Sequence, residues 1–115
     1  MSEATQSREE LLVSDLTAFQ TNALYVIAGE EDTEQCYGLE IMRRLREVYG
    51  RVIHHSRLYT NLERLVDDDF VAKGQLDERT NFYVLTEKGQ YALREYLEWQ
   101  ARHLGPEVSE EGDDA

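Results

Sequence analysis

The residues with the most evident chemistry are four polar side chains that recur at helical spacing near the middle of the chain. They are Arg57, Thr60, Asn61 and Arg64. Their i, i+3, i+4, i+7 spacing places them on one face of a helix. Arginine can bind guanine or phosphate, asparagine can pair with adenine, and threonine offers a hydroxyl and a methyl group, which is the chemistry of major-groove reading. The alternative is a solvated helix surface, because polar residues opposite an apolar stripe are typical of any surface helix.

The helix that must position this face is predicted for residues 56–68. Its other side carries apolar residues at i, i+4, i+7 and i+8, namely Leu58, Leu62, Leu65 and Val66. Ser56 is the expected N-cap, because a serine hydroxyl can accept a hydrogen bond from a backbone N–H of the first turn. His55 and Ser56 are expected to position the helix on DNA. For His55 the alternative is a solvated residue beside His54.

Three further helical patterns and one hairpin surround this segment. A first helix, with Leu16, Phe19, Ala23, Val26 and Ile27 on its apolar side, should end at Gly29, and the acidic run 30–34 is read as a loop. A second should end near Gly50, with apolar residues Gly38, Ile41, Met42, Leu45, Val48 and Tyr49. Two strands are predicted for about 71–75 and 81–85, joined by the turn 77–80, and Thr86 should cap a last helix that runs to about Leu104. This order predicts a mainly α fold with a small β-hairpin, a winged helix-turn-helix with a long C-terminal helix.

Charge is distributed unevenly along the chain. The 115 residues carry 24 acids and 12 bases, and a formal net charge of −12 argues at first against a nucleic-acid ligand. Residues 36–66, however, hold six arginines and two histidines against three acids, so the centre is locally basic. The acid-rich, lysine-poor composition resembles that of proteins from salt-loving archaea, and the alternative is an ordinary acidic domain.

Several short motifs together resemble the PadR-like winged-helix transcriptional regulators. The stretch 37–41 (YGLEI) is similar to that family's Gly-x-Glu-Ile opening of the second helix. Leu58-Tyr59, Leu62, Arg64-Leu65 and Phe70-Val71 resemble its recognition-helix pattern, and 81–89 (NFYVLTEKG) resembles its wing strand and the Leu-Thr-x-x-Gly turn after it. The resemblance covers about residues 15–97 and is strongest to haloarchaeal members, which adds a stress or redox response as an expectation.

The resemblance implies a homodimeric regulator that binds a specific site on double-stranded DNA. Lys73 and Arg79 are then expected to touch the DNA backbone or the minor groove. Asp69 stands where the family usually has glycine, and aspartate tolerates the left-handed backbone better than most residues. The wing tip 77–80 is less basic than usual, which puts strong phosphate clamping by the wing in doubt. The rival interpretation is a winged-helix module that binds another protein and no DNA.

Acidic side chains lie near the surfaces that are expected to meet phosphate. They are Asp67, Asp68, Asp69, Asp77 and Glu78. Bringing them close to DNA should be costly unless inorganic cations lie between the two. The sequence therefore predicts cations as further partners at the interface.

The two ends of the predicted domain, residues 11–104, carry the expected dimer surface. The last helix has more apolar surface than one core contact requires, so the remainder is available to a second chain. The expected dimer residues are Leu12, Leu16, Leu93, Tyr96, Leu97, Trp99 and Leu104. The alternative is that residues 11–16 cover this surface within one chain. Residues 1–10 and 105–115 are predicted to be flexible acidic tails.

The remaining sequence features concern sensing and location. Cys36, just before the second helix, is a candidate redox sensor, with a small buried apolar residue as the alternative. No pattern indicates a catalytic site, and no metal site or other cofactor is expected. The chain has no apolar run of the ~20 residues that span a bilayer and no signal peptide, which predicts a cytoplasmic protein without membrane contact.

Overall fold

The computed structural model describes residues 13–29 and 36–105, and its helices and strands confirm the predicted winged helix-turn-helix. These residues form a short 3-10 helix, four α-helices and three strands. In chain order they are η1 (Val13–Asp15), α2 (Ala18–Ala28), β1 (Cys36–Tyr37), α3 (Gly38–Tyr49), α4 (His55–Asp67), β2 (Val71–Asp77), β3 (Thr80–Leu85) and α5 (Glu87–Leu104). Leu12, most of both predicted tails and the loop 30–34 lie outside the described residues.

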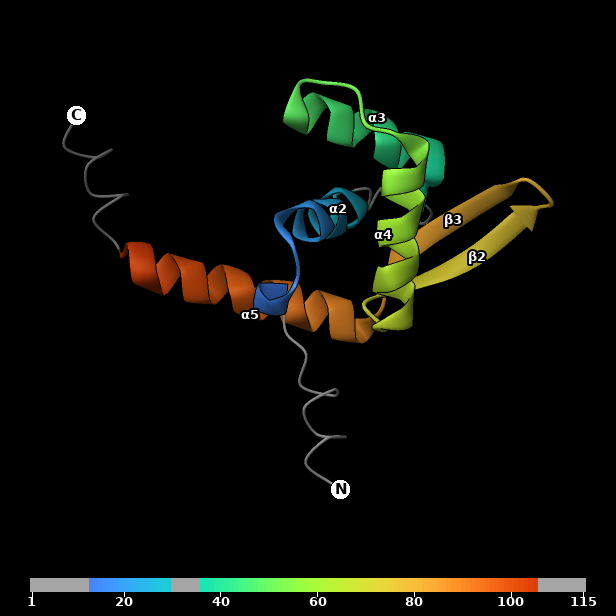
Figure 1. Ribbon diagram of the computed structural model, residues 1–115. Helices are drawn as coiled ribbons and strands as arrows, with labels where there is room; N and C mark the ends of the chain where they lie inside the picture. The colour runs from blue at the N-terminus through green and yellow to red at the C-terminus, as the bar shows by residue number, and fades with distance from the viewer. Residues whose placement is uncertain (1–12, 30–35, 106–115) are drawn as a thin grey trace.

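The core forms where the apolar faces of α2, α3 and α4 meet. Helix α2 lies in the middle and contacts α3, α4 and α5 (Figure 1). Each helix contributes side chains with no exposed surface, which are Ala23, Leu24, Ile41, Leu45, Leu58, Leu62 and Leu65. Because α4 is held along its whole apolar side, its opposite side faces outward from a fixed support.

The sheet contains a strand that was not predicted. Strands β2 and β3 form the expected hairpin, and the two-residue β1 pairs antiparallel with the other edge of β3, in the order β1-β3-β2. Cys36 lies opposite Tyr83 and Tyr37 opposite Phe82. A two-residue strand has no alternating pattern of its own, so only its pairing with β3 identifies it.

The end of α4 packs against the start of α5, and this packing depends on the backbone at Asp69 and Gly89. Asp69 has a left-handed φ of 68°, so aspartate does take the role that glycine has in the resembled family. Thr86 caps α5, as predicted, by accepting a hydrogen bond from the N–H of Gly89. A Cβ at Gly89 would lie 2.2 Å from the carbonyl oxygen of Phe70, so this close packing requires glycine.

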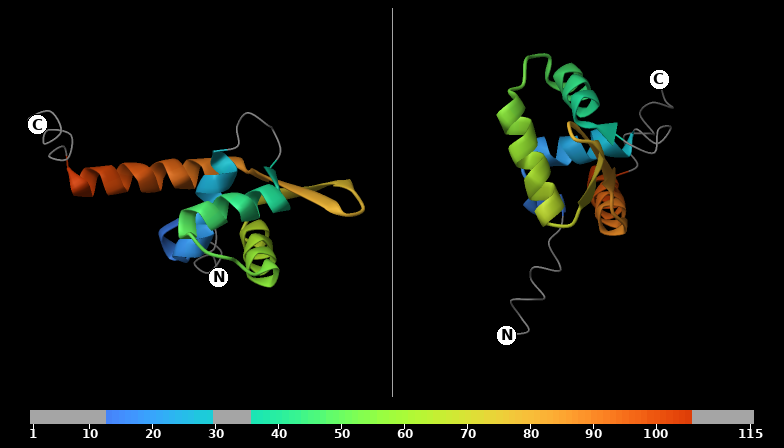
Figure 2. Two further views of the ribbon diagram at one scale, coloured as in Figure 1. Left: turned by 90° about the horizontal axis from the view of Figure 1, so that it is seen from above. Right: turned by 90° about the vertical axis from the view of Figure 1, so that its right-hand side faces the viewer.

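Helix α5 runs away from the body on the side opposite the hairpin (Figure 2). Its first half packs against the core through Ala92 and Leu93, whereas Leu97 and Leu104 are exposed. None of the helices described is long and apolar enough to cross a membrane.

Two details of the helices differ from the sequence-based prediction. Ser56 is not the N-cap of α4: His54 holds that position without a side-chain hydrogen bond, and Ser56 lies inside the first turn. Val48 does not join the core but is exposed at 58%. The apolar pattern of a helix does not show how far along the helix the core extends, because the neighbouring elements decide this.

Candidate nucleic-acid interface

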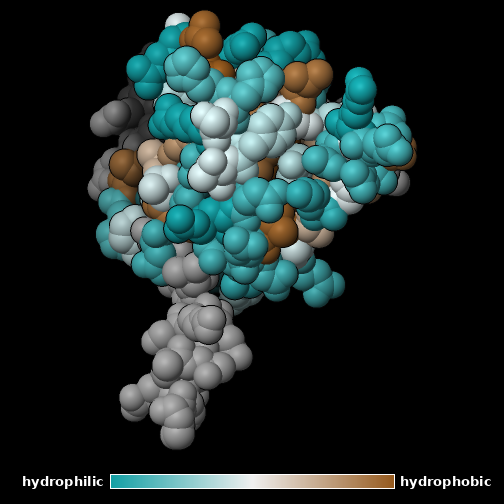
Figure 3. Space-filling view, turned by 45° about the vertical axis from the view of Figure 1, so that its right-hand side comes forward, coloured by the Kyte–Doolittle hydropathy of each residue, from teal (hydrophilic) through white to brown (hydrophobic). Residues whose placement is uncertain are grey.

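The outward face of α4 carries Ser56, Thr60 and Arg64, all exposed. These residues lie opposite the buried stripe of Leu58, Leu62 and Leu65, so the packing of α4 aims them at solvent. The side of the molecule that bears α4 and the hairpin is mainly hydrophilic (Figure 3). No exposed large apolar residue belongs to α4. Exposed hydroxyl and guanidinium groups on a rigid helix suit contacts with base edges and phosphates.

Arg57 and Asn61, the other two residues of the predicted reading face, are in contact with α2. The guanidinium carbon of Arg57 lies 4.0 Å from the ring centroid of Phe19, a cation–π contact. The side-chain oxygen of Asn61 accepts a hydrogen bond from Nε2 of Gln20 at 3.0 Å, and its Nδ2 donates to the carbonyl of Arg57 at 2.8 Å. A base contact by Asn61 would therefore compete with two internal hydrogen bonds.

The hairpin is tied to α4 by a salt bridge at its base. Nζ of Lys73 lies 2.6 Å from a carboxylate oxygen of Glu63, and this hydrogen bond raises the pKa of Lys73. Because the ammonium group is already paired, its expected contact with phosphate is in competition with Glu63. This ion pair is one of the contacts that place the base of the hairpin against α4.

The tip of the hairpin is ordered by a carboxylate. Asp77 accepts hydrogen bonds from the backbone N–H groups of Arg79 and Thr80, each at 2.9 Å, and the first of these is the main cause that lowers the pKa of Asp77. This arrangement leaves the side chain of Arg79 exposed at the turn. The predicted DNA contact by Arg79 is therefore sterically open.

The start of α4 presents an imidazole beside an aromatic ring. His55 stacks on Tyr59 with ring centroids 6.2 Å apart and an interplanar angle of 22°. Tyr59 in turn lies against Gly38, where an added Cβ would come within 2.3 Å of the tyrosine hydroxyl. Both histidines at this end of the helix are exposed.

The acidic turn after α4 uses its backbone to hold α5. The carbonyl of Asp68 accepts a hydrogen bond from Nζ of Lys88, and the carbonyl of Asp69 accepts one from the hydroxyl of Thr86. The carboxylates of Asp67 and Asp69 belong to exposed residues, beside the outward face of α4. Negative charge thus accompanies the candidate DNA-binding surface.

The structure brings in two residues that the sequence interpretation missed. Gln20 and Glu63 have no DNA-reading role in that interpretation, but they hold Asn61 and Lys73 respectively. A sequence signal existed for Gln20, because Thr17 and Gln20 have the spacing of a capping box, and that box is formed. The signal identified a helix start and could not reveal the contact 41 residues away in sequence.

The predicted dimer residues divide into two groups. Leu93 is buried in the core, and Leu16 and Tyr96 pack against that core, so these three stabilise the single chain. Leu97, Trp99 and Leu104 are exposed at 56%, 48% and 66%. Helix α5 also contacts η1, so η1 covers part of α5, while no other segment among residues 13–29 and 36–105 covers its far end.

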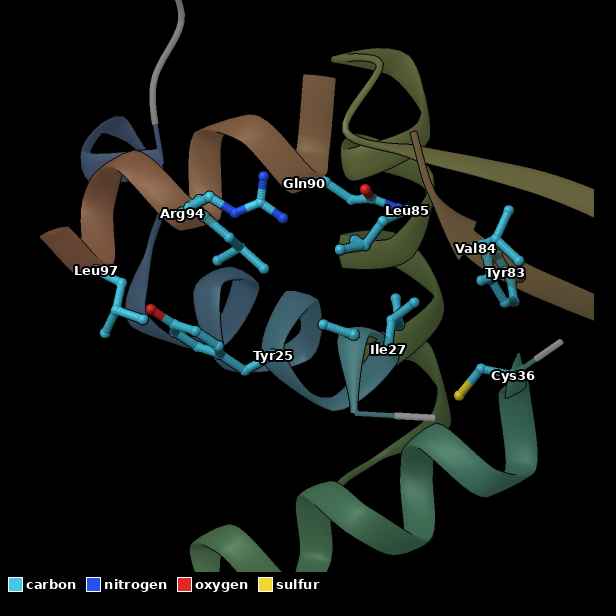
Figure 4. Close-up of a pocket in the computed structure, with 11 residues that line it drawn as sticks. Tyr25, Ile27, Cys36, Tyr83, Val84, Leu85, Gln90, Arg94 and Leu97 are labelled. Carbon is cyan, nitrogen blue, oxygen red and sulfur yellow. The ribbon is translucent and has the colours of Figure 1, made fainter. Parts of the chain in front are cut away.

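Cys36 lies in β1 and is 2% exposed. It lines a cavity of about 550 Å³ between α2, β3 and α5, with Tyr25 and Arg94 at other points of the wall (Figure 4). The burial fits the packing role for this residue. Across residues 13–29 and 36–105, no three His, Cys, Asp or Glu side chains are grouped as metal ligands.

Three helices (α2, α3 and α4) that pack around one core, with a polar face of α4 turned to solvent and a hairpin beside it, form the arrangement of a winged-helix nucleic-acid-binding protein. The chain belongs to the PadR-like family of transcriptional regulators, whose family model matches residues 24–95. It is a DNA-binding transcription regulator and not an enzyme.

Solved structures agree with this assignment. A structure of the H. salinarum protein RosR is 42% identical, with a TM-score of 0.71 over 87% of this chain and 94% of that one. The RosR-S1 complex is 48% identical over 76% and 74% of the two chains, with a TM-score of 0.71. A PadR-like transcription factor from Bacteroides fragilis is 25% identical over 79% and 85%, with a TM-score of 0.57. The expected similarity to haloarchaeal members is thereby confirmed. A comparison with curated protein sequences found no match.

Proposed function

We propose that this regulator binds DNA as a homodimer, with α4 in the major groove and the tip of the β2–β3 hairpin against the backbone or the minor groove. Ser56, Thr60 and Arg64 are the base-reading and phosphate-contacting residues of α4. Arg79 contacts DNA from the hairpin, and His55 meets a phosphate at the helix start. The observation that carries this proposal is the outward polar face of α4, set on a fully buried apolar stripe.

Arg57, Asn61 and Lys73 have a second role in the proposal. Each is held by another protein group, namely Phe19, Gln20 and Glu63 respectively. These contacts orient the helix and the hairpin before DNA arrives, so less order has to be created on binding. Any contact that these three make with DNA adds to that positioning role.

The dimer is supported by the apolar stripe of α5, which continues past the end of the body. Gly89, Ala92, Leu93 and Tyr96 face the core, and the same helical side carries Trp99, His103 and Leu104 further on. The ring of Trp99 stacks on that of Tyr96 at a centroid distance of 6.1 Å and lies tilted by 31° against that of His103 at 4.1 Å. Aromatic and leucine side chains at 3.5-residue spacing are well suited to a second helix. The domain that dimerises in this way is proposed to span residues 11–104.

Cations at the DNA interface are the third part of the proposal. With a net charge of −12 and exposed carboxylates at Asp67 and Asp69, the protein should repel DNA at long range. Ions held between carboxylate and phosphate would offset this repulsion, which suits a protein adapted to high salt. Binding should then take up cations as well as release them, and the usual steep loss of affinity with salt should be flattened or reversed.

The base-reading claim is tested by comparing one specific duplex with random duplex. Arg64→Ala should weaken specific binding by about 1–3 kcal/mol and relax the preference at one base pair. Lys73→Ala serves as the control, because its loss should be smaller and equal on both duplexes. Equal losses for Arg64→Ala on specific and random DNA would contradict direct reading by α4.

The cation claim is tested by measuring affinity from about 0.5 to about 3 M potassium chloride, where screening leaves little long-range electrostatic interaction of either sign. Charge reversal at two exposed carboxylates, by Asp67→Lys/Glu78→Lys, should restore an ordinary decline with salt. A steep decline in the parent protein that the reversals leave unchanged would refute cation uptake and leave DNA binding intact.

A further inference from the structure

Gln20 stands out because, among the described residues, it is the one polar residue that is buried, with 8% of its surface exposed. It lies on α2, which has no expected contact with DNA. A buried amide needs hydrogen-bond partners, and an unpaired one is costly. The partners of Gln20 therefore show what the residue is for.

The amide of Gln20 connects the start of α2 to the recognition helix. Its oxygen accepts a hydrogen bond from the backbone N–H of Thr17 at 3.1 Å, and its Nε2 donates to Oδ1 of Asn61 at 3.0 Å. Asn61 passes the connection on, because its Nδ2 donates to the carbonyl of Arg57. Thr17, Gln20, Asn61 and Arg57 thus form one hydrogen-bonded chain.

The direction of this chain is determined at both ends by the backbone. The N–H of Thr17 can only donate, so the amide oxygen of Gln20 must face it and the NH₂ group must face Asn61. The carbonyl of Arg57 can only accept, so the NH₂ group of Asn61 must face it. Neither amide can be turned over without opposing two like groups.

We infer that Gln20 is a positioning residue for DNA reading: it holds Asn61 and so sets the place of the first turns of α4 relative to α2. The inference rests on the proposed reading of DNA by α4. The contact of Arg57 with Phe19 lies on the same side of α4 and would shift if α2 and α4 separated. Gln20 therefore influences specificity without touching DNA.

The decisive variant is Gln20→Glu, because it separates two roles of the residue. Glutamate can still accept from the N–H of Thr17, so the capping box of α2 is retained. It cannot donate to Asn61 when ionised, and it places an oxygen against an oxygen. We expect specific DNA binding near pH 7.5 to weaken about ten-fold, the scale of one lost buried hydrogen bond, with little change on random duplex.

Thr17→Ala is the matched control. It removes the hydroxyl that accepts from the N–H of Gln20, so it should lower Tm, but it leaves the Gln20–Asn61 hydrogen bond in place. Specific binding by this folded variant should stay close to that of the parent. Gln20→Met, similar in length and without a donor, should lose specific binding as Gln20→Glu does.

The pH dependence of specific DNA affinity distinguishes this role from a general loss of stability. A neutral carboxyl group can donate, so Gln20→Glu should regain specific affinity relative to the parent as the pH falls toward about 5. Parent-like specificity in Gln20→Glu at pH 7.5 would overturn the inference. A loss of DNA specificity in Thr17→Ala that matched its loss of Tm would overturn it as well.

Failure of this inference differs from failure of the proposed function. If Arg64→Ala removes base preference and Gln20→Glu does not, α4 reads DNA without help from Gln20. If neither variant changes base preference, the reading of DNA by α4 is itself wrong.

Discussion

Helix α4 and the end of α5 are both amphipathic, but they differ in whether the apolar side is buried or exposed to solvent. The apolar side of α4 packs into the core, with Leu58, Leu62 and Leu65 showing no exposed surface and Val66 partly buried. At the end of α5 the apolar side itself is exposed, through Trp99 and Leu104. Helix α4 therefore presents polar groups to solvent, and the end of α5 presents an apolar surface.

The difference indicates two different partners. A polar face on a rigid support suits a ligand that offers hydrogen-bond groups and charge, as DNA does. An exposed apolar stripe suits a second apolar surface, because its burial is favourable in proportion to the area removed from water. The proposed DNA surface and the proposed self-association surface thus lie on different helices of one short chain.

The largest expected effect comes from breaking the apolar side of α4. Leu62→Ala leaves a cavity in the core and should lower the free energy of unfolding by about 2–5 kcal/mol. Leu104→Ala, at an exposed position, should change it far less when the protein is dilute. Denaturant unfolding at two protein concentrations measures the free energy of unfolding of both variants. Similar losses of stability in Leu62→Ala and Leu104→Ala would contradict this expectation.

The next effect is expected at the end of α5. Trp99→Glu places a charge on the exposed apolar stripe and should shift a dimer to monomer, because an unpaired charge is costly in an apolar interface. Sedimentation in molar potassium chloride measures the change. Tyr91→Glu is the control, since Tyr91 is exposed at 63% near the start of α5, about two turns before Trp99 and away from the exposed end of the helix. A monomeric parent protein at micromolar concentration would remove the dimer from the account.

A smaller effect is expected at Cys36, which lies in strand β1. Cys36→Ser places a hydroxyl in a buried position, so the variant should be modestly less stable and bind DNA as the parent does in reductant. If the thiol has only a packing role, peroxide should affect DNA affinity equally in both proteins. A peroxide response that disappears in the serine variant would instead establish Cys36 as a sensor.

The smallest effect concerns the tip of the hairpin. The pKa of Asp77 is lowered in the folded protein, so its stabilising contribution is present above its ordinary range and is lost as the pH falls through the folded pKa. We expect the amides of Arg79 and Thr80 to lose protection in acid, measured as their exchange rates divided by the intrinsic rate of an unstructured amide at the same pH. In Asp77→Asn the side-chain oxygen still accepts, so the acid dependence should disappear. Hydrogen exchange by NMR measures the parent protein and the variant. An unchanged acid response in Asp77→Asn would contradict the ordering of the turn by the Asp77 carboxylate.

The fold was predictable because local signals and packing agree along most of the chain. The stripe of Leu58, Leu62 and Leu65 identified α4, and Thr86 identified the start of α5. Strand β1 was not predictable, because two residues contain no periodic signal and depend on pairing with β3. The N-cap of α4 was placed at Ser56 from side-chain chemistry, whereas His54 holds it with backbone geometry alone.

The candidate site was predictable in its residue types and less so in its contacts. Helical spacing showed that Arg57, Asn61 and Arg64 share a side of α4. It did not show that α2 packs against one edge of that side and holds Asn61, because contacts between distant segments leave no local pattern. The pairing of Lys73 with Glu63 was missed for the same reason.

The most direct test of the central claim is selection of binding sites from random duplex DNA by the parent protein and by Arg64→Ala. A homodimer that reads DNA with α4 should select two related half-sites in a palindrome, with centres separated by about one helical turn, ~10 bp. Arg64→Ala should retain that spacing and lose the preference at one base pair in each half-site. A single half-site, or an unchanged preference in Arg64→Ala, would contradict the account.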